Sequence, residues 1–358
     1  MNSSPAVVTG ISGGVDSAVA ACLLKKAGYR VTGINIRVLD TPVENPSLHP
    51  SPLVISDHPD FQIPVFSLNL SAKFFDDVIR YFRNDYLSGR TPNPCMVCNK
   101  TIKWYGLLEG ARMLGAEKIA TGHYARTSFS DGRHRLLKGC DPEKDQSYFL
   151  WMLRQSDLSK TLLPLGGLKK PEVRELARTF GVRAAEKKES QEICFVPNDD
   201  YCGYLKNSIP GLEKQVADGE IVDAGGNVLG LHRGYPFYTI GQRRGLGISA
   251  PEPLYVTGIE PGQNRIRVGS KADLDCRTLT ASNLNWIGIE PPTSAFETAA
   301  RIRYRDREAP CTVEPLGRDD VRVSLQTPKH AVTPGQAVVF YRNAEVLGGG
   351  IIGTVHQP

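Results

Sequence analysis

One segment near the start of the chain combines residue types that suit phosphate chemistry: Gly10-Ile11-Ser12-Gly13-Gly14-Val15-Asp16-Ser17. Glycines let backbone N–H groups approach an anion closely, and Ser12 and Ser17 add hydroxyl donors. The β-branched run 6–11 precedes the glycines and a helical pattern follows them, so the positive end of that helix would face the same anion. The pattern predicts a phosphate-binding loop.

This loop lacks the lysine of a Walker A motif. Instead it resembles the pyrophosphate loop of ATP pyrophosphatases, which cut ATP between the α and β phosphates and adenylylate a substrate. That resemblance implies that all the residues of the loop contact ATP and that Asp16 helps to hold Mg²⁺ with the phosphates. The alternative is a glycine-rich turn between a strand and a helix that binds nothing.

Cysteines supply the second reactive feature. Cys95 and Cys98 follow Gly89-Arg90-Thr91-Pro92-Asn93-Pro94, where we expect a loop fixed by two prolines directly before a helix. A thiolate there, with lysines nearby, should have a lowered pKa. The C-x-x-C spacing alone fits a redox pair, half of a zinc site or part of an iron–sulfur site. Cys194 also has lysines close in sequence.

Taken together, these motifs resemble the bacterial tRNA-specific 2-thiouridylases. The resemblance rests on the phosphate loop, on Gly89–Pro94, on Cys98-Asn99-Lys100 and on Lys187-Lys188-Glu189-Ser190 with Ile193-Cys194-Phe195. Further matches extend it over nearly the whole chain: Thr121-Gly122-His123-Tyr124, Lys144-Asp145-Gln146-Ser147-Tyr148-Phe149, Gly241-Gln242-Arg243-Arg244-Gly245-Leu246-Gly247 and Pro334-Gly335-Gln336.

The resemblance implies a transferase that adenylylates the C2 oxygen of the wobble uridine, position 34 of tRNA, and replaces that oxygen with sulfur, giving 2-thiouridine, AMP and pyrophosphate. Cys194 would carry a persulfide, and Cys98 would attack it. Ile36 and Gly122 would also contact ATP. The residues implied at the tRNA and the target base are Asn93, Pro94, Cys95, His123, Lys144, Asp145, Gln146, Arg303, Tyr304 and Gln336. The implied partners are tRNAs for Lys, Glu and Gln, with a cysteine desulfurase or a persulfide-relay protein as sulfur donor.

Cys95 departs from the family pattern, which has Asp at this position. Cys95, Cys98 and Cys194 could therefore hold a [4Fe–4S] cluster with one iron open to sulfide, so the cluster route stands beside the persulfide route. Two other classes remain open: a different pyrophosphate-loop enzyme, such as a tRNA lysidine synthetase, and a tRNA-binding protein without catalysis. For the remaining cysteines, Cys22, Cys140, Cys202, Cys276 and Cys311, we expect inert packing.

The periodicity predicts an α/β fold followed by β structure. A strand, a helix and a second strand at 31–36 form a βαβ unit, which requires a parallel sheet. We predict three regions: an adenine-nucleotide α-hydrolase-like ATP-binding domain at 1–203 with helices on a parallel sheet, a small central β domain at 204–274, and a β-barrel-like tRNA-binding domain at 275–358. Expected helices cover 72–87, 102–114 and 171–180, and 41–64 reads as a loop.

The composition and the net charge limit the classes of protein to which the chain can belong. With 41% hydrophobic and 23% charged residues, the chain reads as globular, and its net charge of +5 is compatible with a nucleic-acid partner. Period-two arginines in 301–307 predict a strand whose arginines share one face. We see no signal peptide and no apolar span, so we expect a cytoplasmic protein with no membrane partner. In that compartment we expect the cysteines to form no static disulfide framework. We also expect a monomer.

Overall fold

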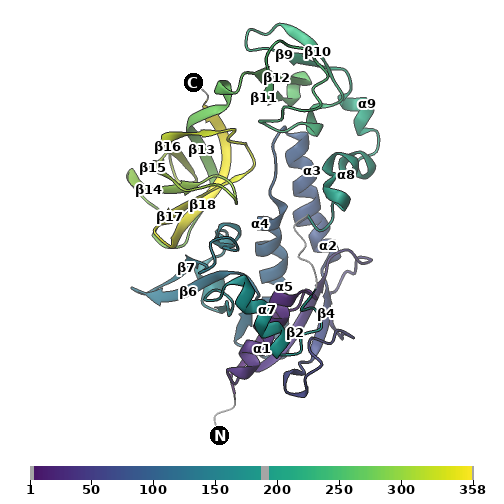
Figure 1. The fold of residues 1–358 in the computed structure, drawn as a ribbon, viewed down its shortest axis with the longest axis vertical. Coiled ribbons are helices and arrows are strands. Elements are labelled where there is room, and N and C mark those ends of the chain that lie inside the picture. Colours follow the sequence, from purple (N-terminus) through teal and green to yellow (C-terminus); the bar gives the residue numbers. More distant parts are fainter. Residues whose placement is uncertain (1–3, 187–192, 357–358) are drawn as a thin grey trace.

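A computed structural model describes residues 4–186 and 193–356 (Figure 1). The Lys187–Ser190 part of the family motif therefore lies outside the described residues. The first sheet has the order β3-β4-β2-β1-β5-β8. All of its strands run parallel except β3 at the edge. Their bounds are β1 Ala6–Gly10, β2 Arg30–Arg37, β3 Leu48–Pro50, β4 Val65–Asn69, β5 Lys118–Ala120 and β8 Thr161–Leu162.

Strand β1 lies inside this sheet and is buried on both faces. Val7 and Val8 are 1% and 0% exposed, and they point to opposite faces because side chains alternate along a strand. Helices α1 (Val15–Lys26) and α7 (Lys170–Thr179) pack on the face of Val7, whereas α5 (Tyr105–Leu114) packs on the face of Val8. The predicted α/β fold, with its βαβ unit and the helix near 171–180, is confirmed.

The two longest helical segments each contain π-helical turns. Helix α2 (Ser71–Phe74) continues through 75–79 into α3 (Arg80–Leu87). Helix α4 (Pro94–Cys98) continues through 99–104 into α5. The helix expected to begin at 102 begins earlier, at Pro94, which occupies the first helical turn, where its missing N–H costs nothing. The loop expected at 41–64 also contains the short edge strand β3.

The central region forms a small sheet of order β10-β9-β12-β11. It is not purely β, because α9 lies within it and buries Leu212 and Val216. The bounds are β9 Gly219–Val222, β10 Val228–His232, β11 Tyr255–Glu260, β12 Arg265–Gly269, α8 Tyr201–Ser208 and α9 Leu212–Val216, and α6 in the first region covers Gln155–Leu158.

The C-terminal sheet is antiparallel and closes on itself, since β13 pairs with both β16 and β18. The hairpin of β6 and β7, although it belongs to the first region by sequence, joins this sheet through β18. The bounds are β6 Ala125–Ser130, β7 Arg133–Lys138, β13 Asp275–Trp286, β14 Phe296–Arg301, β15 Ala309–Pro315, β16 Asp320–His330, β17 Ala337–Arg342 and β18 Glu345–His356. The predicted succession of an α/β region and two β regions is confirmed.

We call the closed C-terminal sheet the barrel, and the continuous helix from Pro94 to Leu114, which carries Cys95 and Cys98, the cysteine helix. The barrel also contacts the segment that leads into the cysteine helix. Thr91 N donates to Pro334 O at 2.9 Å, and Gln336 Nε2 donates to Thr91 O at 2.8 Å. The barrel thus fixes the start of α4 from outside the α/β region. Among the described residues, no helix is long and apolar enough to span a bilayer.

Candidate active site

The phosphate loop lies at the carboxyl end of β1, where parallel sheets hold their ligands. Gly13 adopts a φ of +75°, which favours glycine. Ser17 Oγ accepts from Ser12 N at 3.2 Å and donates to Gly14 O at 3.0 Å. Asn35 Nδ2 donates to Ile11 O at 2.8 Å and ties the loop to β2. Hydrogen bonds within the loop and one from β2 therefore hold its shape.

Gly122 packs directly against the first turn of α1. A Cβ added at Gly122 would lie 2.7 Å from the carbonyl carbon of Asp16 and 2.8 Å from Ser17 N. Those distances are too short for any side chain, so only glycine allows the segment after β5 to approach the loop this closely. The sequence implied a contact of Gly122 with ATP; the structure adds that Gly122 sets the position of the loop.

Asp16 has two close partners that the sequence analysis missed. Lys170 Nζ lies 2.7 and 2.9 Å from the two carboxylate oxygens of Asp16. The Tyr124 hydroxyl donates to Asp16 Oδ1 at 2.7 Å. Lys170 begins α7, beyond the carboxyl end of β8, so a charged residue at that sheet edge is the signal that could have drawn attention to it.

A cavity of about 310 Å³ opens beside the loop, and we call it the nucleotide pocket. Ile36 and Gly122 line it, as the resemblance implied. Cys98 and Cys194, far apart in sequence, line it too. The other loop residues on its wall are Gly10, Ile11, Ser12, Asp16 and Ser17; Gly13, Gly14 and Val15 belong to the loop but do not line the pocket.

The environment of the thiols contradicts the lowered pKa expected from sequence. Burial raises the pKa of Cys98 to about 11, and the charge of Lys103 only partly opposes it. Desolvation by the surrounding protein also raises the pKa of Cys95 and of Cys194, although both side chains keep solvent-exposed surface. Cys98 lies in the second turn of a continuous helix and not at its start, so the first-turn N–H groups do not stabilise its thiolate. The thiols are therefore protonated at neutral pH.

His123 is neutral for a related reason. Burial, with the nearby Lys103 charge, lowers the pKa of His123 to about 3. Its Nδ1 lies 2.9 Å from Thr121 Oγ1, and its ring lies 5.4 Å from the ring of Trp104. His123 lines both the nucleotide pocket and the larger cleft described next, so it can offer a hydrogen bond or a ring face to a substrate but no positive charge.

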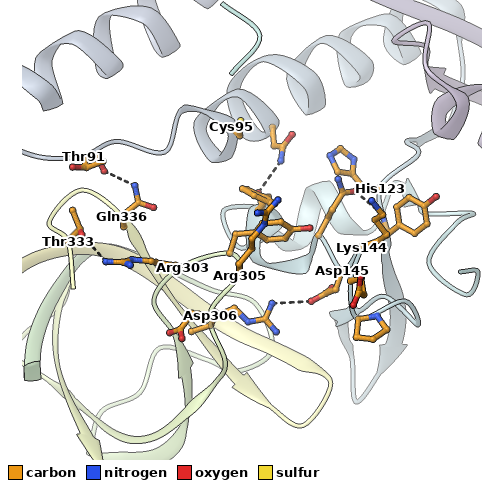
Figure 2. Close-up of a pocket in the computed structure, with 18 of the residues that line it drawn as sticks. Thr91, Cys95, His123, Lys144, Asp145, Arg303, Arg305, Asp306, Thr333 and Gln336 are labelled. Carbon is orange, nitrogen blue, oxygen red and sulfur yellow. Dashed lines mark hydrogen bonds and ion pairs between the residues drawn. The ribbon is translucent and has the colours of Figure 1, made fainter. Parts of the chain in front are cut away.

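A cleft of about 1460 Å³ adjoins the nucleotide pocket, and we call it the large cleft. Figure 2 shows its side chains arriving from the cysteine helix, from the barrel and from the segment with His123 and Lys144. Most of the residues implied at the tRNA line it: Cys95, His123, Lys144, Asp145, Gln146, Arg303, Tyr304 and Gln336. Asn93 and Pro94 are not on its wall but hold the start of α4.

Several of these side chains already have protein partners. Asp145 is 4% exposed and accepts from Ser147 N at 3.1 Å and from Arg301 at 3.3 Å. Arg303 donates to Ala331 O and to Thr333 Oγ1, the latter at 3.3 Å. Asp145 therefore braces the cleft rather than presenting a free carboxylate to a ligand.

The strand expected at 301–307 is wrong. Strand β14 ends at Arg301, and the chain then turns. The guanidinium of Arg303 bonds to Ala331 O and Thr333 Oγ1, in the segment that precedes β17. Arg301, Arg303 and Arg305 still line the large cleft, so they gather in one place through a turn and not through strand alternation.

The remaining cysteines are largely packing residues, as expected. Cys22, Cys276 and Cys311 are buried, and Cys202 is half-buried. Cys140 is exposed, so for this residue the packing expectation is wrong.

Comparison with known proteins agrees with this architecture. A family model described as "tRNA methyl transferase HUP domain" matches residues 5–198, a "tRNA methyl transferase PRC-barrel domain" matches 210–270 and an "Aminomethyltransferase beta-barrel domain" matches 276–352. A tRNA-specific 2-thiouridylase MnmA of Chlorobium phaeobacteroides is 68% identical over 98% of both chains. The chain belongs to the family of tRNA-specific 2-thiouridylases. Proteins of the same name share 67% identity in Chlorobaculum tepidum, over 99% of this chain and 97% of the relative, and 47% in Geotalea uraniireducens, over 98% and 96%.

In this structure the residues fit neither a Mg²⁺ ion on Asp16 nor a [4Fe–4S] cluster on the three cysteines. Within 4–186 and 193–356, no three His, Cys, Asp or Glu side chains converge on one metal position. Cys95 lines the large cleft, whereas Cys98 and Cys194 line the nucleotide pocket, so the three thiols do not face one cavity, although they lie close enough for their charges to interact. Both oxygens of Asp16 accept from Lys170, which occupies the place that a Mg²⁺ ion on this carboxylate would need.

The Gly122 contact can be tested by Gly122→Ala. The added methyl group must displace the first turn of α1, a strain of about 1–3 kcal/mol, so we expect ATP to bind about tenfold more weakly or worse. Calorimetric titration with ATP measures this. Gly167→Ala is the matched control, because no atom lies within 4 Å of its added Cβ. Unchanged ATP affinity in Gly122→Ala would show that the loop position does not depend on this contact.

The raised pKa of Cys98 predicts how fast it is alkylated. Only the thiolate reacts, and with a pKa of about 11 its fraction grows about tenfold per pH unit from pH 8 to pH 10. Iodoacetamide labelling followed by peptide mass spectrometry should therefore show a rate that keeps rising over this range. The same peptide in the unfolded chain should level off near the ordinary thiol pKa. A plateau near pH 8 in the folded protein would contradict the assignment.

Proposed function

We propose that this chain is an ATP-dependent tRNA-uridine 2-sulfurtransferase that converts the wobble uridine of tRNA to 2-thiouridine. The observation that carries the proposal is that the phosphate loop and two cysteines, Cys98 and Cys194, line one pocket although they are distant in sequence. The names of the relatives support tRNA as the substrate and 2-thiouridine as the product. A nucleotide site and two thiols on one wall suit an activation step followed by sulfur transfer.

In the first step, the C2 oxygen of the uridine attacks the α-phosphate of ATP and pyrophosphate leaves. A carbonyl oxygen is a poor leaving group, whereas AMP is a good one, so adenylylation makes C2 susceptible to a sulfur nucleophile. The loop N–H groups and the positive end of α1 would hold the phosphates. Ile36 supplies an apolar wall for the adenine.

In the second step, a donor persulfide passes its outer sulfur to the Cys194 thiolate and leaves as a thiolate. The Cys98 thiolate then attacks the Cys194 sulfur, and the outer sulfur departs as hydrosulfide, which displaces AMP from C2. A Cys98–Cys194 disulfide remains, and an external dithiol must supply two electrons to restore both thiols. A cysteine desulfurase or a persulfide-relay protein is the class of donor that the chemistry requires.

The large cleft is the proposed tRNA site. A wobble base stacks within the anticodon loop, so the base must turn out of that loop to reach the nucleotide pocket. Tyr304 lies beside Phe149, with ring centroids 4.5 Å apart, and these rings offer a surface on which a base can stack. Arg305 and Lys144 line the same cleft and suit the phosphate backbone. We propose tRNAs for Lys, Glu and Gln as substrates, a cytoplasmic location and a monomeric enzyme.

Replacing Cys194 tests the sulfur step. With Cys194→Ser, formation of 2-thiouridine from tRNA, ATP and a persulfide donor should fall to background, because the persulfide has no carrier. tRNA-dependent release of pyrophosphate should continue, since activation needs no thiol. Mass spectrometry of tRNA nucleosides measures the first and a phosphate assay the second. Cys140→Ser, which removes an exposed cysteine outside both cavities, is the control and should match the wild type. Undiminished formation of 2-thiouridine by Cys194→Ser would exclude sulfur transfer through a Cys194 persulfide. A modified nucleoside that forms only when free lysine is added would instead indicate a tRNA lysidine synthetase.

The cluster route makes a different prediction about Cys95. After purification without oxygen, the persulfide route requires that the iron-free enzyme form 2-thiouridine and that Cys95→Ser retain most of that activity. Iron and acid-labile sulfide assays, run beside the nucleoside measurement, decide the point. Activity only in iron-loaded protein, lost in Cys95→Ser, would replace the persulfide carrier with a [4Fe–4S] cluster on Cys95, Cys98 and Cys194.

A further inference from the structure

Lys170 is a buried lysine that the two steps above do not use. Its side chain is 9% exposed, and its ammonium contacts both oxygens of the Asp16 carboxylate in the phosphate loop. Its backbone N–H donates to Asp141 Oδ2 at 2.9 Å, which fixes the start of α7 beneath the loop. Tyr124 packs over the ammonium, which lies 5.7 Å from the ring centroid. The amine is thus placed by several neighbouring groups.

Stability alone does not explain why the Lys170 ammonium is buried beside Asp16. Taking an ammonium out of water costs several kcal/mol unless its partners compensate, so a buried lysine is weak support for stability on its own. Asp16 already has a hydrogen bond from Tyr124 and lies in the first turn of α1, whose positive end stabilises a carboxylate. The carboxylate therefore does not need Lys170, whereas a polyphosphate arriving at the loop brings several negative charges.

Lys170 lies on the side of Asp16 that faces the large cleft. Asp16 lines both cavities, whereas Lys170 and Tyr124 line the large cleft only. If the adenine lies beside Ile36 and the α-phosphate lies at the loop, as proposed above, the outer phosphates would point toward Asp16, which lines both cavities. The loop itself has no lysine, unlike a Walker A motif, so the cation that meets the outer phosphates must come from another element.

We propose that Lys170 is a nucleotide-binding residue that contacts the β- and γ-phosphates of ATP and the departing pyrophosphate, with Asp16 and Tyr124 as the groups that position its ammonium. This inference rests on the proposed use of ATP. Lys170 donates hydrogen bonds and stays protonated throughout, so it stabilises the negative charge that collects on pyrophosphate as the bond to the α-phosphate breaks.

The test compares ATP, inorganic pyrophosphate and AMP as ligands of Lys170→Gln, by calorimetric titration without tRNA and with EDTA, so that no divalent cation replaces the ammonium. Losing one charge-assisted contact should weaken ATP and pyrophosphate about tenfold to a hundredfold and change AMP by less than about twofold. Lys170→Arg should keep the wild-type preference for ATP over AMP. Lys169→Gln is the matched control, because Lys169 is exposed and precedes the same helix.

Two results would overturn the inference. Unchanged ATP and pyrophosphate binding in Lys170→Gln would leave Lys170 as a partner of Asp16 only. An equal loss of ATP and AMP would show that the variant damages the loop instead of a phosphate contact. If Lys170→Gln does not fold, Lys170→Met takes its place in the same titrations, and unchanged binding of ATP and pyrophosphate in that variant refutes the contact. Because no tRNA is present, these results are independent of whether the chain thiolates uridine.

Discussion

The contact between Gly122 and the first turn of α1 is the constraint on which the site depends. Strands β1 and β5 are neighbours in a parallel sheet, so the segments that leave them meet at one edge. Because residue 122 has no side chain, the two backbones touch, and the residues after Gly122 are brought over the loop. His123 then reaches both cavities and Tyr124 reaches Asp16. One close approach therefore sets the positions of the phosphate loop, a neutral histidine and a buried hydroxyl.

Buried carboxylates then join elements that the sheet alone would leave independent. Asp157 on α6 pairs with Lys100 in the cysteine helix, and Asp145 pairs with Arg301 at the end of β14 in the barrel. A buried ion pair adds little net stability, but removing one partner leaves an uncompensated charge, so such pairs enforce one arrangement. The barrel contacts at Thr91 act in the same direction through the backbone. The large cleft thus has walls from separate regions held in a fixed relation.

The sequence predicts well those features that residues close together in the chain determine. The strand, loop and helix around Gly13 are encoded within a short stretch, and the succession of an α/β region and β regions follows from periodicity. Prediction failed where a distant group decides. The arginines at 301–307 alternate as in a strand, yet β14 ends at Arg301 and Arg303 bonds to Ala331, which lies in a distant segment of the chain. Lys170 carries no motif, and only the folded sheet shows that its amine meets Asp16. The high thiol pKa of Cys98 likewise depends on burial that no spacing reveals.

The raised pKa of Cys98 bears on the sulfur transfer proposed above, because only a thiolate attacks a persulfide. Raising the pKa of Cys98 from 9.0 to about 11 lowers its thiolate fraction at neutral pH about a hundredfold. A more basic thiolate is more nucleophilic, with a sensitivity of about 0.4–0.5 per pKa unit, which recovers roughly six- to tenfold. The net loss is about one order of magnitude. Well-oriented reactants gain effective molarities of about 10⁵ M or more, which outweighs this loss many times over. If Cys98 and Cys194 transfer sulfur as proposed, a pocket that orients them well can therefore tolerate protonated resting thiols.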